Sequence, residues 1–410
     1  MTPYIRLAVL LLTLNAPLFA SYPLVGHFRP AEGPQVVGGP VFVIFEVVNT
    51  GNQRVSFRSA NPLNPCAGYR FVIDGEHRAD DTCDGYKSFS CVSDTIALPP
   101  GGKDSQNVLL NFFYDLPHAG PYSVLATREV SWWTGDRDSD EDRVQRQTFE
   151  GDVELDLQPA DPAAIGAVLK PYIQGLASPD HEARLEAMQA LEYPAQASLE
   201  STFIEMLSSD DWNEALAALR RLNSPRARKV LAQIAEFGVQ AKSDANDLKG
   251  SDRSSEQYQA IGYLGEMGDP TYLSLLLKIA QQAPRESQNR LYATWAVGEL
   301  GGPEAISFLV SELNAPDHGW HITAAVSLAS TASRDAVPVF IDLLESPDAD
   351  LREVAENGLE TLTHRVVTTE DVSEMDPAKV HSLWADWWKL NSAGAQMYGE
   401  HDCGDKLLID

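Results

Sequence analysis

Alanine recurs at a near-regular interval through the second half of the chain, and an apolar side chain follows each alanine by four positions. The alanines are Ala187, Ala215, Ala260, Ala293, Ala324 and Ala355. The apolar partners are Leu191, Leu219, Leu264, Val297, Leu328 and Leu359. Because residues four apart lie on one face of an α-helix, each pair predicts a helix with one buried stripe. The small alanine lets a neighbouring helix come close.

A second apolar helix is predicted after each of these helices, beyond a short break with Gly, Asn, Ser or Pro. Residues 265–270 and 298–303 match almost residue for residue, 33 positions apart. A helix pair repeated at a near-fixed period is the sequence signature of a solenoid. We therefore predict an α-solenoid over residues 160–365.

This repeat resembles the HEAT repeat family in its short bacterial form, also called PBS-lyase HEAT-like. The resemblance covers about half of the chain and implies a stack of about five or six helix pairs. Arrays of this family usually serve as binding scaffolds. The phycobilin lyases of the family name act inside cells, and no pigment-handling motif is present, so that activity is not predicted.

One interval breaks the rhythm of the repeats. The spacing from Ala215 to Ala260 is 45 residues, and the surplus falls in the polar stretch 238–254. Insertions in a solenoid form loops on one face, which is often the binding face. A tolerated surface loop without function is the equally open alternative.

The chain after the repeats, residues 366–410, is predicted to form a capping helix and a tail. Asp376 and Pro377 open that helix, which carries Trp384, Trp387 and Trp388. The last repeat of an array must cover its apolar end, and the tryptophans would do so. A similar Trp-rich end occurs in other bacterial HEAT proteins.

The N-terminal part, residues 21–159, has the alternation and turn signals of strands. Strands are predicted at 41–48, 55–57, 69–73, 108–114, 122–132 and 153–157. Strands of this length and spacing, separated by Gly and Pro, favour a β-sandwich. The predicted fold is therefore a β-sandwich followed by an α-solenoid.

Three short segments of this part, 98–102, 114–116 and 120–124, resemble a recurring arrangement in small extracellular Ig-like sandwiches. In that arrangement Tyr122 would be the tyrosine whose hydroxyl pins a corner. A weaker similarity extends to bacterial proteinase-inhibitor-like sandwiches. Both resemblances imply a fold and no site.

Residues 1–20 have the pattern of a secretory signal peptide. Arg6 supplies the positive start, Leu7 to Leu14 the apolar segment, and Ala20 the small residue before a cut at Ser21. The apolar segment is too short to span a bilayer, so no membrane insertion is predicted. We expect a periplasmic or secreted protein.

Cys66, Cys83, Cys91 and Cys403 fit that compartment, where oxidising surroundings favour disulfides. Four cysteines allow three pairings. We favour Cys83–Cys91, which closes a polar loop and leaves Cys66–Cys403 to tie the tail to the first domain. None of them has the two-residue separation of a zinc knuckle, so no metal site is predicted from them.

The formal net charge is −28, from 59 acidic and 31 basic side chains. Nucleic acids are bound by Lys and Arg that displace counterions, so a nucleic-acid partner is not predicted. A basic peptide is a compatible partner. Solubility of an exported protein is the alternative reason for the charge.

An acidic side chain stands at every second position of one run, at Asp136, Asp138, Asp140 and Asp142. Oxygen ligands at alternating positions suit a calcium loop. The glycine and the distal Glu of an EF-hand are missing, however, and arginines flank the run. We favour a solvated acidic hairpin turn over a calcium site.

The sequence carries no catalytic signature. It has no Gly-x-Ser-x-Gly elbow, no His-Glu-x-x-His and no phosphate-binding glycine loop. We predict a non-enzymatic protein–protein interaction scaffold without a cofactor. Two alternatives stay open: a protease inhibitor acting through the sandwich, and a hydrolase of unrecognised type.

The predicted contact residues for a protein or peptide partner follow from the repeat register. In such arrays the second helix of each repeat is expected to line the concave side. The residues on predicted second helices are Glu205, Lys278, Glu312 and Asp342. Tyr292 and Trp320, on first helices, are the aromatic candidates.

Overall fold

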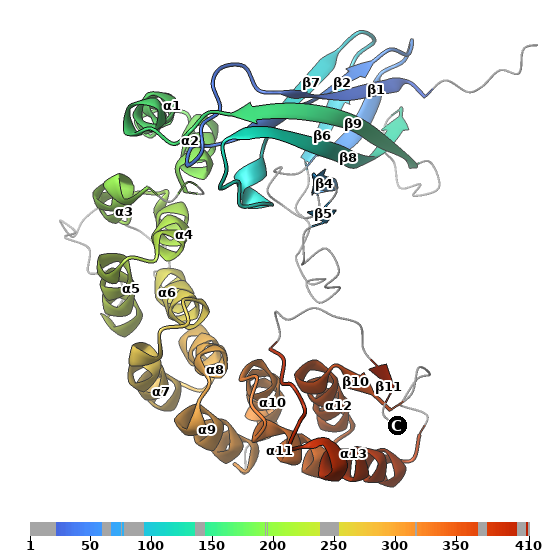
Figure 1. The fold of residues 1–410 in the computed structure, drawn as a ribbon, viewed down its shortest axis with the longest axis vertical. Helices are drawn as coiled ribbons and strands as arrows, with labels where there is room; N and C mark the ends of the chain where they lie inside the picture. The colour runs from blue at the N-terminus through green and yellow to red at the C-terminus, as the bar shows by residue number, and fades with distance from the viewer. Residues whose placement is uncertain are drawn as a thin grey trace, which may run out of the picture.

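The protein consists of a β-sandwich followed by a curved, two-layered array of helices (Figure 1). The computed structural model describes residues 22–59, 67–74, 76–77, 94–135, 144–192, 194, 196–237, 254–315, 318–367, 375–399 and 407–408. Both parts of the predicted fold are confirmed. No helix among these residues is long and apolar enough to cross a membrane.

Several predicted features lie outside the described residues. They are the signal segment 1–20, the cysteines Cys66, Cys83, Cys91 and Cys403, the acidic run Asp136, Asp138, Asp140 and Asp142, and all but the last residue of the stretch 238–254. These features stay predictions.

The strands of the sandwich form two sheets. They are β1 (Leu24–Pro30), β2 (Phe42–Asn49), β3 (Val55–Ser59), β4 (Tyr69–Ile73), β5 (Glu76–His77), β6 (Asp94–Leu98), β7 (Lys103–Leu109), β8 (Gly120–Thr134) and β9 (Gln145–Leu157). One sheet has the order β1-β2-β7, and the other has the order β5-β4-β8-β3-β6. The strand β9 runs antiparallel to β8 along its remaining edge, from the pair Gly120–Leu157 to the pair Trp132–Gln145.

One strand prediction is wrong in its extent. The apolar run 108–114 suggested a single strand, but β7 ends at Leu109 and η3 (Leu110–Phe112) turns the chain away. The side chain of Asn111 accepts a hydrogen bond from the backbone N–H of Val41 at 2.7 Å. Leu109 and Leu110 are both buried, so the alternation of a strand is lost at this point.

The tyrosine corner is present. The hydroxyl of Tyr122 donates to the carbonyl of His118 at 3.0 Å and accepts from the N–H of His118 at 3.1 Å. These bonds fix the turn that leads into β8, as the resemblance to Ig-like sandwiches implies.

A buried cation lies in the core of the sandwich. Arg128 of β8 is 1% exposed, and its guanidinium carbon lies 4.7 Å from the ring centre of Phe45 and 4.6 Å from that of Tyr69. Burial lowers the pKa of Arg128. The hydroxyl of Tyr69 and the carboxyl of Asp104 act in the opposite direction and raise this pKa. The aromatic faces replace part of the solvation that the guanidinium loses.

The helices follow the sandwich in pairs. They are α1 (Pro162–Gly175), α2 (His181–Glu192), α3 (Glu200–Met206), α4 (Trp212–Leu222), α5 (Pro225–Phe237), α6 (Ser254–Glu266), α7 (Leu273–Gln282), α8 (Gln288–Leu300), α9 (Pro303–Leu313), α10 (His321–Ser330), α11 (Ala336–Leu343), α12 (Ala349–Thr363) and α13 (Pro377–Asn391). Short 3-10 turns precede some of them: η5 (Ala197–Leu199), η6 (Pro270–Tyr272) and η7 (His318–Trp320). The strands β10 (Arg365–Val366) and β11 (Leu407–Leu408) pair in parallel.

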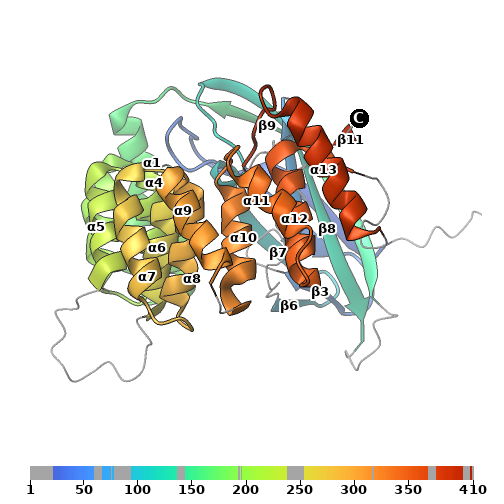
Figure 2. The same cartoon turned by 90° about the horizontal axis from the view of Figure 1, so that it is seen from below.

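The array has an inner layer of helices on its concave side and an outer layer on its convex side (Figure 1). The alanine-marked helices α4, α6, α8, α10 and α12 line the inner, concave side of the arc, and α3, α5, α7, α9 and α11 lie on its outer side (Figure 1). Figure 2 shows the helices of the array side by side, seen from below. The prediction that the second helices line the concave side is therefore wrong.

Small residues on the inner helices explain this curvature. A Cβ at Gly265 of α6 would lie 2.6 Å from the Cα of Ala296 in α8. A Cβ at Gly298 of α8 would overlap the carbonyl oxygen of Ser327 in α10. The inner helices can therefore approach closely, and a two-layered stack bends toward the layer with the shorter spacing.

Polar side chains three positions before the marker alanine bind the end of the preceding repeat. Arg184, His321 and Arg352 lie within hydrogen-bond distance of the carbonyls of Ser178 (3.1 Å), Ala315 (2.8 Å) and Ser346 (2.8 Å), and Gln257 reaches that of Ala235 at 2.9 Å. Ala235 lies in the last turn of α5, where carbonyls have no partner within the helix, and the other three carbonyls lie in the loops that follow α1, α9 and α11. These bonds therefore give partners to backbone carbonyls at the junctions between repeats.

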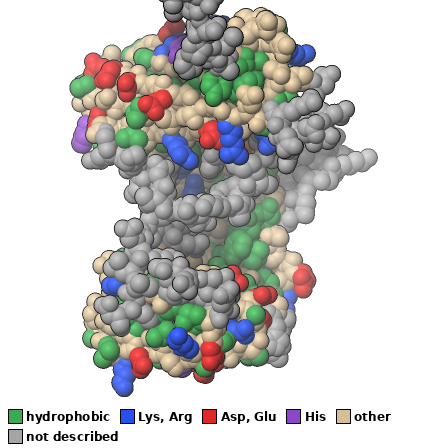
Figure 3. Space-filling view, turned by 90° about the vertical axis from the view of Figure 1, so that its right-hand side faces the viewer, with side chains coloured by type: hydrophobic (Ala, Val, Ile, Leu, Met, Phe, Trp, Pro, Cys, Tyr) green, Lys and Arg blue, Asp and Glu red, His purple; other side chains and the backbone are tan. Residues whose placement is uncertain are grey.

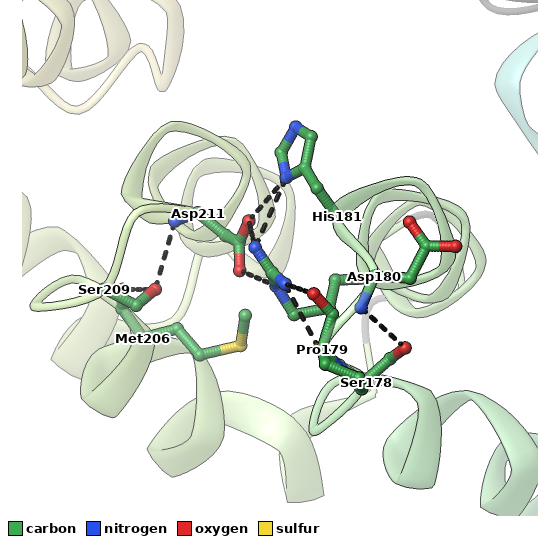
Figure 4. Close-up of polar contacts among 8 residues, drawn as sticks. Ser178, Pro179, Asp180, His181, Met206, Ser209 and Asp211 are labelled. Carbon is green, nitrogen blue, oxygen red and sulfur yellow. Dashed lines mark hydrogen bonds and ion pairs between the residues drawn. The ribbon is translucent and has the colours of Figure 1, made fainter.

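Asp211 and Asp348 stand directly before α4 and α12, at the N-cap position of each helix, but their carboxylates bind different groups. Asp348 accepts the N–H of Asp350 at 3.0 Å. Asp211 makes no such bond. Its carboxylate accepts a hydrogen bond from Arg184 Nε at 2.8 Å, and its Oδ1 lies 3.4 Å from Nδ1 of His181 (Figure 4). Asp211 thus joins α2 to α4 instead of capping its own helix.

The sandwich packs directly on the first helices of the array. Phe42 of β2 lies 6.0 Å from Tyr172 of α1, measured between ring centres. Asn107 of β7 donates to Glu186 of α2 at 2.8 Å. The smaller sheet is therefore the one that meets the array.

Candidate binding surface

The inner layer of the array carries a partly exposed aromatic cluster. Tyr258 lies on α6, and Tyr292 and Trp295 lie on α8. The ring centres of the two tyrosines are 4.7 Å apart, and those of Tyr292 and Trp295 are 5.1 Å apart. Trp295 is 40% exposed although it is one of the largest apolar side chains of the array. An exposed aromatic cluster of this kind is a feature of interaction surfaces.

The repeat pattern places this cluster on the open side of its helices. Trp295 stands two positions after the buried marker Ala293, about 200° around the helix from it. Gly262 of α6 makes room for the cluster, because a Cβ there would lie 3.1 Å from Cδ1 of Tyr292. The side chains opposite the buried stripe therefore face the concave side.

The next repeat extends the surface. Val326 of α10 occupies the position that Trp295 has in α8, and it is 39% exposed. Figure 3 looks into the open side of the arc and shows hydrophobic side chains in the hollow between the sandwich and the last helices. We call Tyr258, Tyr292, Trp295 and Val326 the inner patch.

The inner helices around this patch are acidic. The acidic side chains of α6, α8, α10 and α12 are Glu256, Glu266, Glu299, Asp350, Glu353, Glu356 and Glu360. The basic ones are Arg290 and Arg352. Arg290 is buried, and it donates to Glu312 at 2.8 Å. A partner at this surface would therefore meet a negative field.

The basic side chains at the other end of the concave side are also paired. Arg221 of α4 donates to Glu192 of α2 at 2.8 Å, and Arg220 forms an ion pair with Glu266 of α6. Burial raises the pKa of Glu192, and the charge of Arg221 opposes that rise. Arg220 also lies over the ring of Tyr263 at 5.0 Å. These pairs link consecutive inner helices and offset the charge of both arginines.

The predicted contact residues are dispersed by the fold. Glu205 and Asp342 are exposed, but their helices α3 and α11 belong to the outer layer (Figure 1). Lys278 of α7 pairs with Glu236 of α5 at 2.8 Å. These residues form no common surface on the concave side.

The remaining candidates have two different environments. Arg290 contacts both Glu312 and Trp320. It forms an ion pair with Glu312, and its guanidinium carbon lies 5.2 Å from the ring centre of Trp320. Tyr292 belongs to the inner patch. Of the predicted residues, Tyr292 is the one that the structure brings to the aromatic surface.

Sequence reasoning missed Trp295 and Tyr258. The sequence does indicate that Trp295 is exposed. It stands two positions from both Ala293 and Val297, so it lies on the opposite face of the helix from the buried stripe that they mark. A tryptophan at such a position has no place in the core of the repeat. No group of three His, Cys, Asp or Glu side chains in the described part of the chain is placed to hold a metal ion.

Comparison with known proteins identifies the repeats. The model of the HEAT repeat family matches residues 282–360, from the end of α7 through most of α12. The helical array is a HEAT-repeat solenoid. HEAT arrays are typically interaction scaffolds that bind along their concave surface. No curated protein sequence matches the chain.

Solved structures with some likeness to the chain are distant ones. The YibA protein of Escherichia coli is 14% identical, with a TM-score of 0.31, and the match covers 50% of this chain and 77% of that one. Human deoxyhypusine hydroxylase is 14% identical, with a TM-score of 0.23, covering 55% and 96%. The alpha-2-macroglobulin of Salmonella is 11% identical, with a TM-score of 0.18, covering 82% and 26%. TM-scores this low carry no argument about function.

Proposed function

We propose that the protein is an exported, non-enzymatic scaffold that binds a basic protein or peptide segment on the concave side of its HEAT array. The observation that carries the proposal is the partly exposed aromatic cluster of Tyr258, Tyr292 and Trp295 on the inner helices. Aromatic anchors of this kind contribute much of the affinity at protein interfaces. Export is supported by the N-terminal pattern of Arg6 and the apolar segment Leu7 to Leu14.

The charge of the surface favours a basic occupant. Acidic side chains outnumber basic ones on the inner helices, and Arg290 and Arg220 are already engaged with Glu312 and Glu266. A segment with an apolar side chain flanked by Lys or Arg would fill the inner patch, and the excess negative charge of the inner helices would attract its cations. Steering by opposite charge would speed its association and make binding weaker at high salt.

The test uses the full chain and a displayed library of random peptides. Peptides selected on the protein are expected to be basic and to contain an aromatic or aliphatic residue. Trp295→Ser should weaken the binding of a selected peptide at least about tenfold, because a central aromatic anchor is lost. Fluorescence anisotropy of the labelled peptide at low and at high salt measures both effects.

Phe237→Ser is the matched control. Phe237 is 62% exposed and ends α5 in the outer layer, so its loss removes a comparable apolar surface from the other side of the array. Peptide binding should be unchanged in this variant. Equal loss of affinity in both variants, or selection of acidic peptides, would contradict the proposal.

A further inference from the structure

The last helix, α13, is held on the end of the array by apolar side chains and by a carboxyl group. α13 buries Val380, Trp384 and Trp387 in the same core as the preceding repeats. Trp384 is fully buried, and its indole N–H faces the carboxyl of Glu356 on α12. A group that can ionise therefore lies inside the interface between α12 and α13.

The interface gives the ionised form of Glu356 little support. Glu356 is buried, with 7% of the residue exposed. Its Oε1 atom and the Nε1 atom of Trp384 make no hydrogen bond of ordinary geometry to the described residues. A carboxylate that leaves water needs strong hydrogen bonds or a cation to replace its solvation. A negative charge on Glu356 is therefore costly while α13 is docked.

The repeats show that packing does not require a carboxyl at this position. Glu356 follows the marker Ala355 directly, and the side chains at the equivalent position of the other alanine-marked helices are all buried. They are Met188, Leu216, Ile261, Thr294 and Ala325. Among the six alanine-marked helices, α12 is the one that carries an acid where the others carry uncharged side chains.

The charged groups around Glu356 are mostly acidic. A pocket of about 570 Å³ between α12 and the start of α13 is lined by Glu356 and by four other charged side chains of α12, which are Asp350, Arg352, Glu353 and Glu360. The side chains that line it from the neighbouring segments are uncharged, and they are Leu344, Met375, Pro377 and Val380. The Nη1 atom of Arg352 donates to the carbonyl of Ser346 at 2.8 Å. The charge of Glu360 makes ionisation of Glu356 still less favourable.

A second titratable contact joins α13 to the end of α11. Nδ1 of His381 lies 3.8 Å from Oε1 of Glu345. An imidazole carries a positive charge only when it is protonated, so this contact is an ion pair in acid and loses its attraction at higher pH. Both contacts of α13 therefore favour docking at low pH.

We propose that α13 is a pH-sensitive cap, which is docked on α12 while Glu356 is neutral and is released when Glu356 ionises. Release brings the carboxylate of Glu356 into water. It also exposes Trp384 and the apolar end of the array that this side chain covers. The inference does not depend on partner binding at the inner patch.

The direction of the effect follows from the two states of Glu356. Burial raises its pKa in the docked state to about 7 from the ordinary value of 4.5, the charge of Glu360 adds to the rise, and the indole N–H of Trp384 opposes it. Release returns the carboxyl to its ordinary pKa. Docking is therefore strongest below about pH 4.5 and weakens as the pH rises through about 7. Between pH 6 and pH 8 the ratio of released to docked α13 should rise about tenfold.

Hydrogen exchange of the full chain at pH 6, 7 and 8, followed by mass spectrometry, tests the proposal. Each measured rate is divided by the rate of an unstructured peptide at the same pH, which gives the open fraction of each helix. The open fraction of α13 should rise at least about tenfold from pH 6 to pH 8. The open fraction of α8, in the middle of the array, is the internal reference and should stay constant.

Glu356→Gln keeps the shape of the side chain and stays neutral at every pH. In this variant the open fraction of α13 should rise less than about threefold, which is the share left to His381 and Glu345. Glu356→Met places in α12 the side chain that α2 has at this position, and it should behave in the same way. Glu353→Gln is the matched control, because Glu353 is an exposed carboxylate of the same helix, and it should keep the tenfold rise. A tenfold rise in both neutral variants, or an equal rise in α8 of the unaltered protein, would overturn the proposal.

Discussion

The sandwich joins residues that are far apart in sequence, whereas the array joins neighbouring repeats. Tyr69 of β4 pairs with Arg128 of β8, and Val55 of β3 pairs with Thr134 of the same strand. In the array, Gly265 meets Ala296 and Gly298 meets Ser327, each about one repeat later. Stability in the array is therefore a sum of local interfaces, while the sandwich depends on one shared core.

The two parts also treat buried polar groups differently. The array uses them at the ends of helices, where Arg184, Gln257 and His321 satisfy backbone carbonyls. The sandwich buries the charge of Arg128 between two aromatic rings. A change in the array should thus act on one inter-repeat contact, and a change in the sandwich should act on the whole domain.

The largest effect is expected from Gly298→Val in the array. The new side chain would overlap the backbone of Ser327, which cannot move without displacing α10. We expect the free energy of unfolding to fall by about 4 kcal/mol, more than is usual for overpacking because the overlap is with backbone atoms. Urea denaturation followed by circular dichroism at 222 nm measures the loss.

Gly166→Val is the matched control for this substitution. Gly166 lies in α1, and a Cβ there would have no neighbour within 4 Å. Its unfolding energy should change by less than about 1 kcal/mol. Hydrogen exchange in Gly298→Val should accelerate in α8 and α10 and stay unchanged in β8 and β9. Equal acceleration in the sandwich would contradict the independence of the two parts.

The second effect is expected from Arg128 in the sandwich. Arg128→Ala leaves a cavity between Phe45 and Tyr69 and should cost about 3 kcal/mol. Arg128→Met fills the space without a charge, so it should lie within about 1 kcal/mol of the unaltered protein. The Nε and Nη1 atoms of Arg128 have no hydrogen-bond partner among the described residues, so part of the solvation that its charge loses on burial is not replaced. Hydrogen exchange in β8 and β9 reports on this domain. A methionine variant as unstable as the alanine variant would mean that the charge itself is stabilising.

The array is made of local contacts and the sandwich of long-range ones, and this difference explains how much of each part the sequence predicts. A period of about thirty residues marks Ala260, Ala293 and Ala324, so the array and its helices follow from spacing alone. In the sandwich the strands follow from alternation, but nothing local indicates that β3 and β4 share one edge of β8. The strand expected at 108–114 failed because the side chain of Asn111 closes a turn onto Val41, a contact 70 residues away.

The third effect depends on pH and concerns Glu356 of α12. Its pKa in the folded protein is about 7, above the ordinary value of 4.5, because burial favours the neutral form. The stability that this group contributes is full below about pH 4.5 and is lost as the pH rises through about 7, by up to roughly 3 kcal/mol. Glu356→Gln stays neutral, so its advantage over the unaltered protein should grow across that window. Urea denaturation at pH 4.5, 6 and 8 measures the difference. A constant difference would show that Glu356 keeps its ordinary pKa.

The binding surface is harder to predict from the sequence than the helices of the array, because it depends on how closely the helices pack. The expectation that second helices line the concave side directed attention to Glu205, Lys278, Glu312 and Asp342. The direction of curvature depends on how closely neighbouring helices of each layer approach, as Gly265 approaches Ala296 and Gly298 approaches Ser327, and such distances cannot be read from periodicity. The exposed face of α8 could have been predicted, because Trp295 lies opposite the buried stripe.

The smallest changes in the free energy of unfolding are expected when one hydroxyl is removed from each part. Tyr122→Phe in the sandwich removes both hydrogen bonds to His118 and should cost about 1 kcal/mol, since a backbone N–H and a carbonyl lose their partner. Thr294→Val in α8 removes the hydroxyl that donates to the carbonyl of Arg290 at 2.9 Å. That carbonyl also belongs to the hydrogen-bond ladder of its helix, so the cost should stay below about 0.5 kcal/mol. Urea denaturation of both variants decides the comparison. A larger loss for Thr294→Val would mean that side-chain hydrogen bonds stabilise the repeats as much as they stabilise the corner of the sandwich.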